Sequence, residues 1–317
     1  MSEGTVGAIG EFGLIDAVVA RFPSTPAVLV GPGDDAAVVA TPDGRVVATT
    51  DLLVECRHFR RDWSSAFEVG RKSAAQNLAD VVAMGARPTA LLVGFGAPAD
   101  LPVAWATGLA DGFAHECGLV GAAVVGGDVV RSDQVVIAVT ALGDLEGRAP
   151  VGRAGARAGD VLAIAGRLGW AAAGLAVLGR GFRSPRVLAD AHRTPEPPYE
   201  SGFAAARGGA TAMIDISDGL VQDAGHVARA SGVELRIDTA CLVVAAPVAE
   251  AAAAFNVDPL GWVLTGGDDH ALLAAFPPDV ALPDGFAQVG EVVAGEPIVL
   301  VDGAPYAGPG GHDHFAS

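Results

Sequence analysis

The sequence predicts an α/β (α+β) fold in which two domains each contain mixed sheets covered by helices. Short runs rich in valine and isoleucine alternate with longer alanine-rich stretches, which is typical of strands followed by covering helices. The chain has 317 residues, of which 51% are hydrophobic, and this suffices for two sizeable cores. Segment 143–160 is rich in glycine and arginine and poor in large apolar residues, so it predicts the domain connection. We therefore expect domains at 1–145 and 146–317.

The first domain is expected to open its sheet with a β-hairpin at 36–50, because apolar runs flank a Pro-Asp-Gly turn. This hairpin places Asp51 at a strand end. A helix is expected at 65–85, since Ser65 and Glu68 have the spacing of a capping box. The other expected elements are strands near 90–95, 122–125 and 134–142 and a helix at 103–116.

The second domain is expected to continue this alternation without a repeat of fixed period. A loop is expected at 192–202. The expected strands and helices lie at 161–166 (strand), 170–178 (helix), 210–220 (strand and turn into a helix), 233–238, 287–293 and 297–303 (strands).

The formal net charge of −17 argues against nucleic acid or an anionic membrane as partner, because both would repel the chain. A phosphate-bearing ligand would then need metal ions as intermediaries. Cys56, Cys117 and Cys241 are odd in number and show no CxxC spacing, which disfavours a disulfide framework or a zinc site. We see neither a signal-peptide pattern nor an apolar run that would span a bilayer, so we expect a cytoplasmic protein.

Several aspartates fall just past an apolar run or on a helix face, and strand ends are where α/β folds place their ligand sites. Taken singly, each is more simply explained as a turn or N-cap residue. Together they indicate a carboxylate-rich site for Mg²⁺, which bridges carboxylates to the phosphates of a substrate. These residues are Asp34, Asp35, Asp51, Asp80, Asp128, Asp215, Asp218, Asp268 and Asp269.

Lys72 is the only lysine in the chain, and neither a GxxxxGK[ST] loop nor the VAIK and HRD motifs of protein kinases occur. If the chain handles a nucleoside triphosphate, it is neither a P-loop enzyme nor a protein-kinase fold. Metal ions, glycine-rich backbone amides and a few arginines such as Arg131 and Arg153 would then stabilise the negative charge of the phosphates.

Motifs along nearly the whole chain occur in a recognisable order. They read GEFGLI from Gly10, GDDAAV from Gly33, TTDLLVECRHF from Thr49, NLADVVAMGARP from Asn77, VGGDVVR from Val125, IDISDGLVQDAGH from Ile214, LTGGDDHAL from Leu264 and GHDHF from Gly311. In these motifs the chain resembles the thiamine-monophosphate kinase family, which belongs to the superfamily of aminoimidazole ribonucleotide synthetase. The resemblance implies two α/β domains, a homodimer formed through the N-terminal sheets, and ATP-dependent phosphorylation of thiamine monophosphate to thiamine diphosphate.

The resemblance also implies roles for individual residues. The acceptor is already an ionised phosphate, so no dedicated catalytic base is expected. Asp34, Asn77 and Asp223 are expected to support the site. The implied Mg²⁺ positions are Asp35, Thr49, Thr50, Asp51, Asp80, Asp128, Asp215 and Asp218. The implied ATP positions are Gly127, Asp128, Arg153 and Ser217, and the implied substrate positions are His58, Asp268 and His312.

The chain departs from the family pattern in two places. Where the family usually has GGEDYE, this chain has GGDDHA, so Asp268, His270 and Ala271 replace glutamate, tyrosine and glutamate. Near the C-terminus, His312 stands where an aromatic residue is expected. We expect these changes to cluster on the acceptor side and to leave the ATP and metal side intact. The resemblance assigns no role to Asp269.

Two other functions stay open from the sequence. One is an enzyme like aminoimidazole ribonucleotide synthetase, which TTDLLVECRHF and GHDHF disfavour. The other is a noncatalytic regulator that binds Mg-nucleotide and has lost activity through its altered acceptor residues. A hydrogenase maturation enzyme would need a C-terminal cysteine and a selenophosphate synthetase a cysteine or selenocysteine near the N-terminus, and the sequence has neither.

Overall fold

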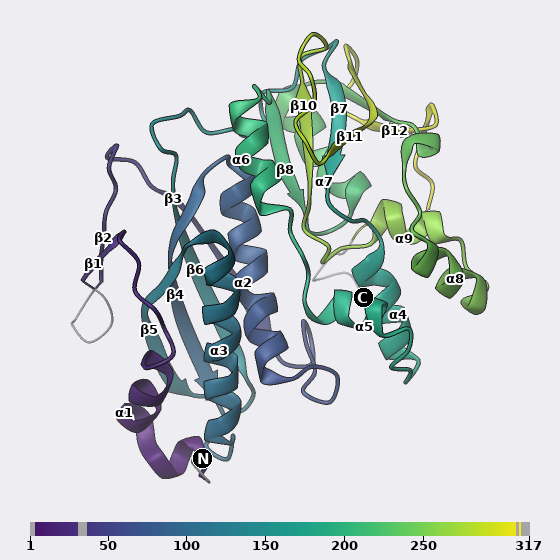
Figure 1. The fold of residues 1–317 in the computed structure, drawn as a ribbon. Coiled ribbons are helices and arrows are strands. Elements are labelled where there is room, and N and C mark those ends of the chain that lie inside the picture. The colour runs from purple at the N-terminus through teal and green to yellow at the C-terminus, as the bar shows by residue number, and fades with distance from the viewer. Residues whose placement is uncertain (1–3, 31–36, 309–310, 312–317) are drawn as a thin grey trace. The chain divides into compact units, whose positions relative to one another are not determined.

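The computed structural model describes residues 4–30, 37–308 and 311 (Figure 1). The chain divides into two compact units. The first comprises Met1–Val81 and Ala86–Arg148, and the second comprises Val82–Gly85 and Ala149–Ser317.

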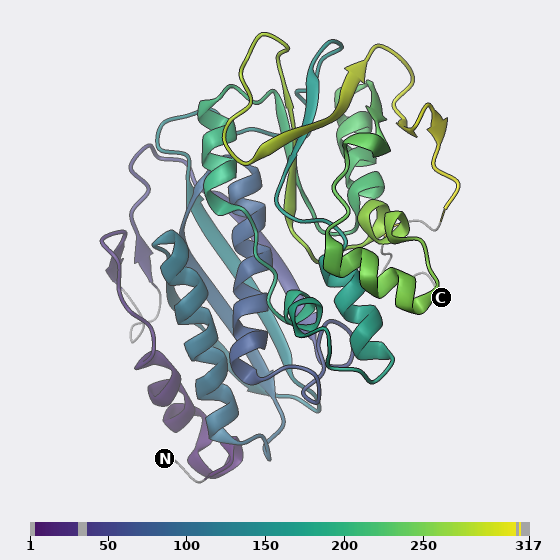
Figure 2. The same cartoon turned by 45° about the vertical axis from the view of Figure 1, so that its right-hand side comes forward.

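The first unit is built on a four-stranded sheet with helices on one face. The strand order is β3 (Val47–Val54), β6 (Val136–Asp144), β4 (Arg87–Ala97) and β5 (Ala123–Arg131). The β4–β5 pair is parallel and the other pairs are antiparallel, so the sheet is mixed. Figure 2 shows one face of this sheet covered by α2 (Ala66–Ala83) and α3 (Val103–Val120), with α1 (Val6–Val19) beside α3.

Helix α2 begins where the sequence predicts, because the expected capping box forms. The amide and hydroxyl of Ser65 donate to the Glu68 carboxylate at 2.6 and 2.9 Å, and the Glu68 amide donates to the Ser65 hydroxyl at 3.3 Å. The helix buries Leu78 and Val81 against the unit's core. Its polar residues 76 and 80 are four apart and therefore lie on one face.

The hairpin predicted at 36–50 is wrong. The turn forms, since the Gly44 amide donates to the Thr41 carbonyl at 3.0 Å, but the flanking strands do not pair with each other. β2 (Val38–Val39) pairs with β1 (Val28–Val30), whereas β3 pairs with β6 along its whole length. The longer ladder with β6 satisfies more backbone groups than a pairing with β2 would. Asp51 therefore lies inside β3 and not at its end.

The second unit contains a seven-stranded mixed sheet. Its order is β13 (Ala304–Pro305), β12 (Val299–Val301), β9 (Glu234–Ile237), β11 (Phe286–Val293), β7 (Val161–Ala165), β10 (Ala271–Phe276) and β8 (Ala212–Ile216). Only the β9–β12 pair is parallel among these described strands. All six residues of β10 are buried, and the strand lies between β7 and β8 in the sheet. The helices are α4 (Trp170–Gly179), α5 (Arg186–Arg193), α6 (Tyr199–Arg207), α7 (Leu220–Ser231), α8 (Ala246–Phe255), α9 (Pro259–Thr265) and the 3-10 turn η1 (Thr239–Cys241).

The loop predicted at 192–202 is shorter than expected. α5 ends at Arg193 and α6 already begins at Tyr199. The prolines of the segment are confined to residues 195–198, and Pro198 directly precedes α6, where a missing amide costs the helix nothing.

Both units combine a mixed sheet with helices, which confirms the predicted α/β (α+β) class. Among the helices that the structure describes, none is both long enough and apolar enough to cross a bilayer.

Candidate active site

In the first unit, Thr49, Asp51 and Asp80 lie together on the side of the sheet that faces α2. Residues 49 and 51 are two apart on β3, so their side chains share a face. The Thr49 hydroxyl donates to Asp80 Oδ2 at 2.7 Å, and Gln76 Nε2 donates to Asp51 Oδ2 at 3.1 Å. These donors are neutral and leave the negative charge of the carboxylates in place. The group offers the hard oxygen ligands that Mg²⁺ prefers.

Thr50 and Asp128 lie apart from this group. The Thr50 hydroxyl donates to the Val139 carbonyl at 2.9 Å, and strand alternation puts it on the opposite face from Thr49. Asp128 lies on β5, the edge strand opposite to β3. Three strand spacings separate the two edges by roughly 14 Å. Of the expected metal residues described in this unit, the structure therefore groups Thr49, Asp51 and Asp80 and leaves Thr50 and Asp128 separate from them and from each other.

Gly127, an expected ATP position, lies close to the neighbouring strand. A Cβ atom at this position would overlap the Val93 carbonyl oxygen of β4. The site therefore requires glycine here for the backbone of β5 to approach β4.

In the second unit, Asp218 is held by the first turn of α7. Its amide and that of Gly219 both donate to Asp223 Oδ2, at 3.0 and 3.1 Å, and Gln222 Nε2 donates to Asp218 Oδ2 at 3.2 Å. Burial, together with the charges of Asp215 and Asp218, raises the pKa of Asp223 to about 7, although the hydrogen bonds from the amides of Asp218 and Gly219 act to lower it. Asp223 thus shapes the loop that carries Asp218, in line with its expected supporting role.

The GGDD segment packs against the loop at Ser217. A Cβ on Gly267 would overlap the Ser217 carbonyl, so the glycine permits close approach. That same carbonyl accepts the Asp268 amide at 2.9 Å. Asp268 has a left-handed backbone with φ of 68°, which is uncommon outside glycine. The structure therefore brings an expected substrate residue next to an expected ATP residue.

Asp269 has a structural role that the sequence does not reveal. Its carboxylate accepts the amides of Trp170 and Ala171 at 3.1 and 2.8 Å, and so caps the start of α4 from a distant part of the chain. Burial raises the pKa of Asp269 to about 7, although the backbone amides of Ala171 and Gly169 and the charge of Arg167 favour the ionised form.

We expect Asp269 to make stability depend on pH. The unfolded carboxyl titrates near 3.8 and the folded one near 7, so between these values the folded state retains a proton that the unfolded chain has released. The free energy of unfolding should therefore fall as the pH rises from about 4 to about 7, and level off above. Urea unfolding of the wild type and of Asp269→Asn across this range tests it. A difference between the two proteins that does not change with pH would contradict the assignment.

His270 is buried beside Asp215, with Nδ1 and Oδ2 3.1 Å apart. Asp215 is an expected Mg²⁺ position. One of the departures from the family pattern, His270, therefore lies beside an expected Mg²⁺ position.

His58 belongs to the first unit and Arg153 to the second. His58 is half-buried, and its Nδ1 accepts the Val54 amide at 2.9 Å, which places the proton of the neutral ring on Nε2. Arg153 is exposed, and with Arg229 it lowers the pKa of His226 on α7, after the larger effect of burial. Asp34, Asp35 and His312 lie outside the described residues.

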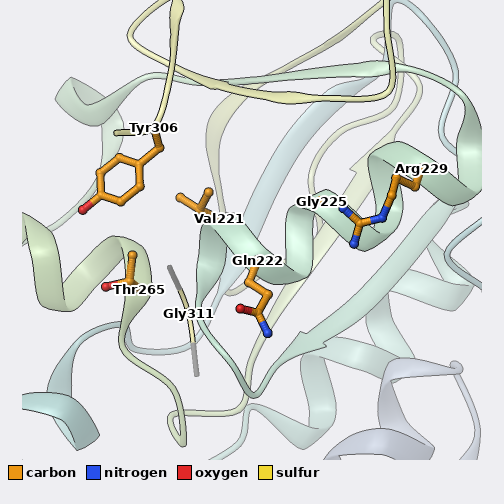
Figure 3. Close-up of a pocket in the computed structure, with 7 residues that line it drawn as sticks. All are labelled: Val221, Gln222, Gly225, Arg229, Thr265, Tyr306 and Gly311. Atoms are coloured by element: carbon orange, nitrogen blue, oxygen red, sulfur yellow. The ribbon is translucent and has the colours of Figure 1, made fainter. Parts of the chain in front are cut away.

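A pocket of about 200 Å³ opens along α7 in the second unit (Figure 3). It is lined by Val221, Gln222, Gly225, Arg229, Thr265, Tyr306 and Gly311. This volume is below the roughly 300–1,000 Å³ of sites for larger ligands. None of the expected site residues within the described ranges lines it, although Gln222 connects it to Asp218.

Comparison with known proteins identifies the family. The family model described as AIR synthase related protein, N-terminal domain, matches residues 33–145, and the model for the C-terminal domain matches 157–302. A thiamine-monophosphate kinase from Mycobacterium tuberculosis is 51% identical over 98% of this chain and 93% of its own length. One from Corynebacterium glutamicum is 41% identical over 94% and 91%. The chain belongs to the thiamine-monophosphate kinase family.

A solved member of the thiamine-monophosphate kinase family supports the fold assignment. The structure of AaThiL complexed with AMPPCP and TMP has a TM-score of 0.80 and 33% sequence identity, and the match covers 97% of this chain and 98% of that one. Its ligands are an ATP analogue and the monophosphate for which the thiamine-monophosphate kinases are named.

The structure adds three residues to the candidate site of this thiamine-monophosphate kinase family member. Gln76 holds Asp51, His270 contacts Asp215, and the His192 Nδ1 lies 4.0 Å from Asp268 Oδ2. The position of Gln76 four residues before Asp80 is a helical spacing that could have indicated it. Nothing in the local sequence relates His192 or His270 to their partners, because these pairs form across separate elements.

Proposed function

We propose that this chain transfers the terminal phosphoryl group of ATP to thiamine monophosphate, giving thiamine diphosphate. The observation that carries the proposal is the hydrogen bond from the Asp268 amide to the Ser217 carbonyl, because it joins an expected substrate position to an expected ATP position. Two observations on relatives support the proposal. The similar proteins are named thiamine-monophosphate kinases, and the AaThiL structure was solved as a complex with AMPPCP and TMP.

The reaction brings one polyanion against another, and it needs charge screening more than a base. Mg²⁺ ions, when bound, would screen both phosphates and align an in-line transfer. The residues that would hold them include Asp51 and Asp80 in the first unit and Asp215 and Asp218 in the second. Within the described residues no three His, Cys, Asp or Glu side chains are grouped to hold a metal. This donor set fits Mg²⁺, which completes its coordination with water and substrate phosphates.

The test is to incubate the purified chain with Mg²⁺, ATP and thiamine monophosphate and to detect thiamine diphosphate by mass spectrometry. We expect product that depends on all three components. Activity only on a purine precursor would move the assignment to a function like that of aminoimidazole ribonucleotide synthetase. Tight metal-dependent ATP binding without any product would instead indicate a noncatalytic regulator.

We infer further that the chain acts as a homodimer in the cytoplasm. The helix-free side of the first unit's sheet carries Leu52 and Leu92, whose side chains are 51% and 37% exposed. In the register of the sheet, Leu52 lies opposite Ala138, and Leu92 opposite Thr140. Exposed leucines on a helix-free sheet face favour packing against a second copy. Its three cysteines are free, which suits a reducing compartment.

Leu52→Arg is expected to weaken that dimer by at least about tenfold, because it would bury an unpaired charge in the interface. Leu119→Arg is the matched control, since Leu119 is 55% exposed on α3, on the helical side of the same unit. Sedimentation velocity over a range of concentrations measures the effect. Equal behaviour of the two variants would show that this face is not the interface.

A further inference from the structure

His270 and Asp215 form a buried polar pair within the second unit. The His270 Nδ1 and the Asp215 Oδ2 are 3.1 Å apart, and both residues are 4% exposed. The pair forms across neighbouring strands, because Asp215 on β8 lies opposite Leu272 on β10. The His270 amide also donates to the Ile216 carbonyl at 3.1 Å. Backbone and side chain of His270 are therefore both anchored to the strand that carries Asp215.

The backbone of His270 is held in an unusual conformation. Its φ is 51°, in the left-handed region that non-glycine residues rarely adopt. This conformation occurs immediately before β10, where the chain leaves the GGDD segment. Strain of this kind persists only where surrounding contacts determine it, and it clusters at functional sites.

The hydrogen bond leaves the two oxygens of Asp215 unequal. When Asp215 is ionised, as a Mg²⁺ ligand must be, it only accepts, so His270 Nδ1 then carries the proton and donates to Oδ2. A donor on one oxygen restricts rotation of the carboxylate, so Oδ1 would be the oxygen offered to a cation. Carboxylates that bind metals are commonly oriented by such hydrogen bonds.

We propose that His270 is a positioning residue that orients the Asp215 carboxylate for a divalent cation. The inference rests on the proposed function, which makes Asp215 a Mg²⁺ ligand. His270 acts through Asp215 and does not itself touch substrate or metal. Its replacement should therefore change the affinity for the cation more than the affinity for thiamine monophosphate.

Two variants separate orientation from packing. In His270→Asn the side-chain amide nitrogen takes the place of Nδ1, and asparagine tolerates the left-handed backbone better than most residues. In His270→Leu a side chain with as many heavy atoms as asparagine, branched at the same carbon, removes the donor. Ile237→Val trims one methyl group from the buried strand β9 and controls for general loss of stability.

The direct measurement is Mn²⁺ binding, followed by the electron paramagnetic resonance signal of free Mn²⁺, with the metal alone and with AMPPCP. Asp215→Asn defines the part of the binding that depends on this carboxylate. We expect His270→Leu to weaken that part by about tenfold or more, and His270→Asn to stay within about threefold of the wild type. In the kinase assay, the Mg²⁺ concentration for half-maximal rate should rise in His270→Leu, while KM for thiamine monophosphate stays unchanged.

Wild-type Mn²⁺ affinity in His270→Leu would overturn the proposal, as would an equal loss in His270→Leu and His270→Asn. An equal loss in Ile237→Val would also overturn it, because the effect would then follow from stability. If the wild type makes no thiamine diphosphate, the proposed function fails, but the Mn²⁺ comparison still decides whether His270 orients Asp215.

Discussion

The Asp80→Asn variant is expected to lose about 10²- to 10³-fold in kcat while remaining folded. A bound metal ion supplies several kcal/mol of charge stabilisation in the transition state, and each 1.36 kcal/mol corresponds to a factor of ten. Asparagine retains an oxygen that accepts the Thr49 hydroxyl, so the contact between β3 and α2 survives. Asp51→Asn is expected to behave alike, because its remaining oxygen still accepts from Gln76. Steady-state rates at saturating Mg²⁺, with melting temperatures, measure both variants.

The matched control is Asp16→Asn, which removes an exposed carboxylate from α1 in the same unit. Its rate should equal that of the wild type. Near wild-type rates in Asp51→Asn and Asp80→Asn would contradict the prediction that these acids hold catalytic Mg²⁺. A loss of rate together with a large fall in melting temperature would point to a structural role instead.

The Gly219→Ala variant is expected to lower the free energy of unfolding by about 2–5 kcal/mol, from backbone strain and overpacking together. Gly219 has φ of 124° and ψ of 146°, a conformation essentially restricted to glycine. An added Cβ would also lie 2.7 Å from the Thr265 carbonyl carbon. Because its amide donates to Asp223, the same change should displace the loop of Asp218 and reduce turnover. Scanning calorimetry and the kinase assay measure the two effects.

Gly232→Ala at the other end of α7 is the control for Gly219→Ala. Gly232 also has a positive φ, of 68°, but a Cβ there would meet open space. It should cost only about 1–2 kcal/mol, from the left-handed conformation. Equal losses in the two variants would show that contact with Thr265 contributes nothing.

Local patterns in the sequence predicted those parts of the fold that depend on neighbouring residues. The capping box at Ser65 and Glu68 set the start of α2, and the apolar runs located β4, β7 and β8, because caps and periodicity act within one element. The hairpin at 36–50 failed because strand partners are chosen across the whole chain: Thr50 on β3 pairs with Thr140 on β6. The long ladder between β3 and β6 was more favourable than a hairpin closed by the turn at 41–44.

In the candidate site, too, local sequence identified the residues but not their arrangement in space. From sequence, Thr49, Thr50 and Asp51 formed a single motif, but strand alternation sends the Thr50 side chain to the opposite face. Adjacent acids in GGDD likewise looked equivalent, yet Asp268 lies against Ser217 while Asp269 caps α4.

By itself, the sequence determined the fold class, the family resemblance and a carboxylate-rich chemistry suited to Mg²⁺, because these follow from composition, short-range spacing and motif order. Only the tertiary structure decided which acids share a face and that Asp269 caps helix α4. It also decided that His270, directly before β10, contacts Asp215 on β8. Those outcomes depend on strand register and on contacts between residues far apart in the chain. No local pattern encodes such contacts one by one, since each is selected by the burial and hydrogen bonding of the whole unit.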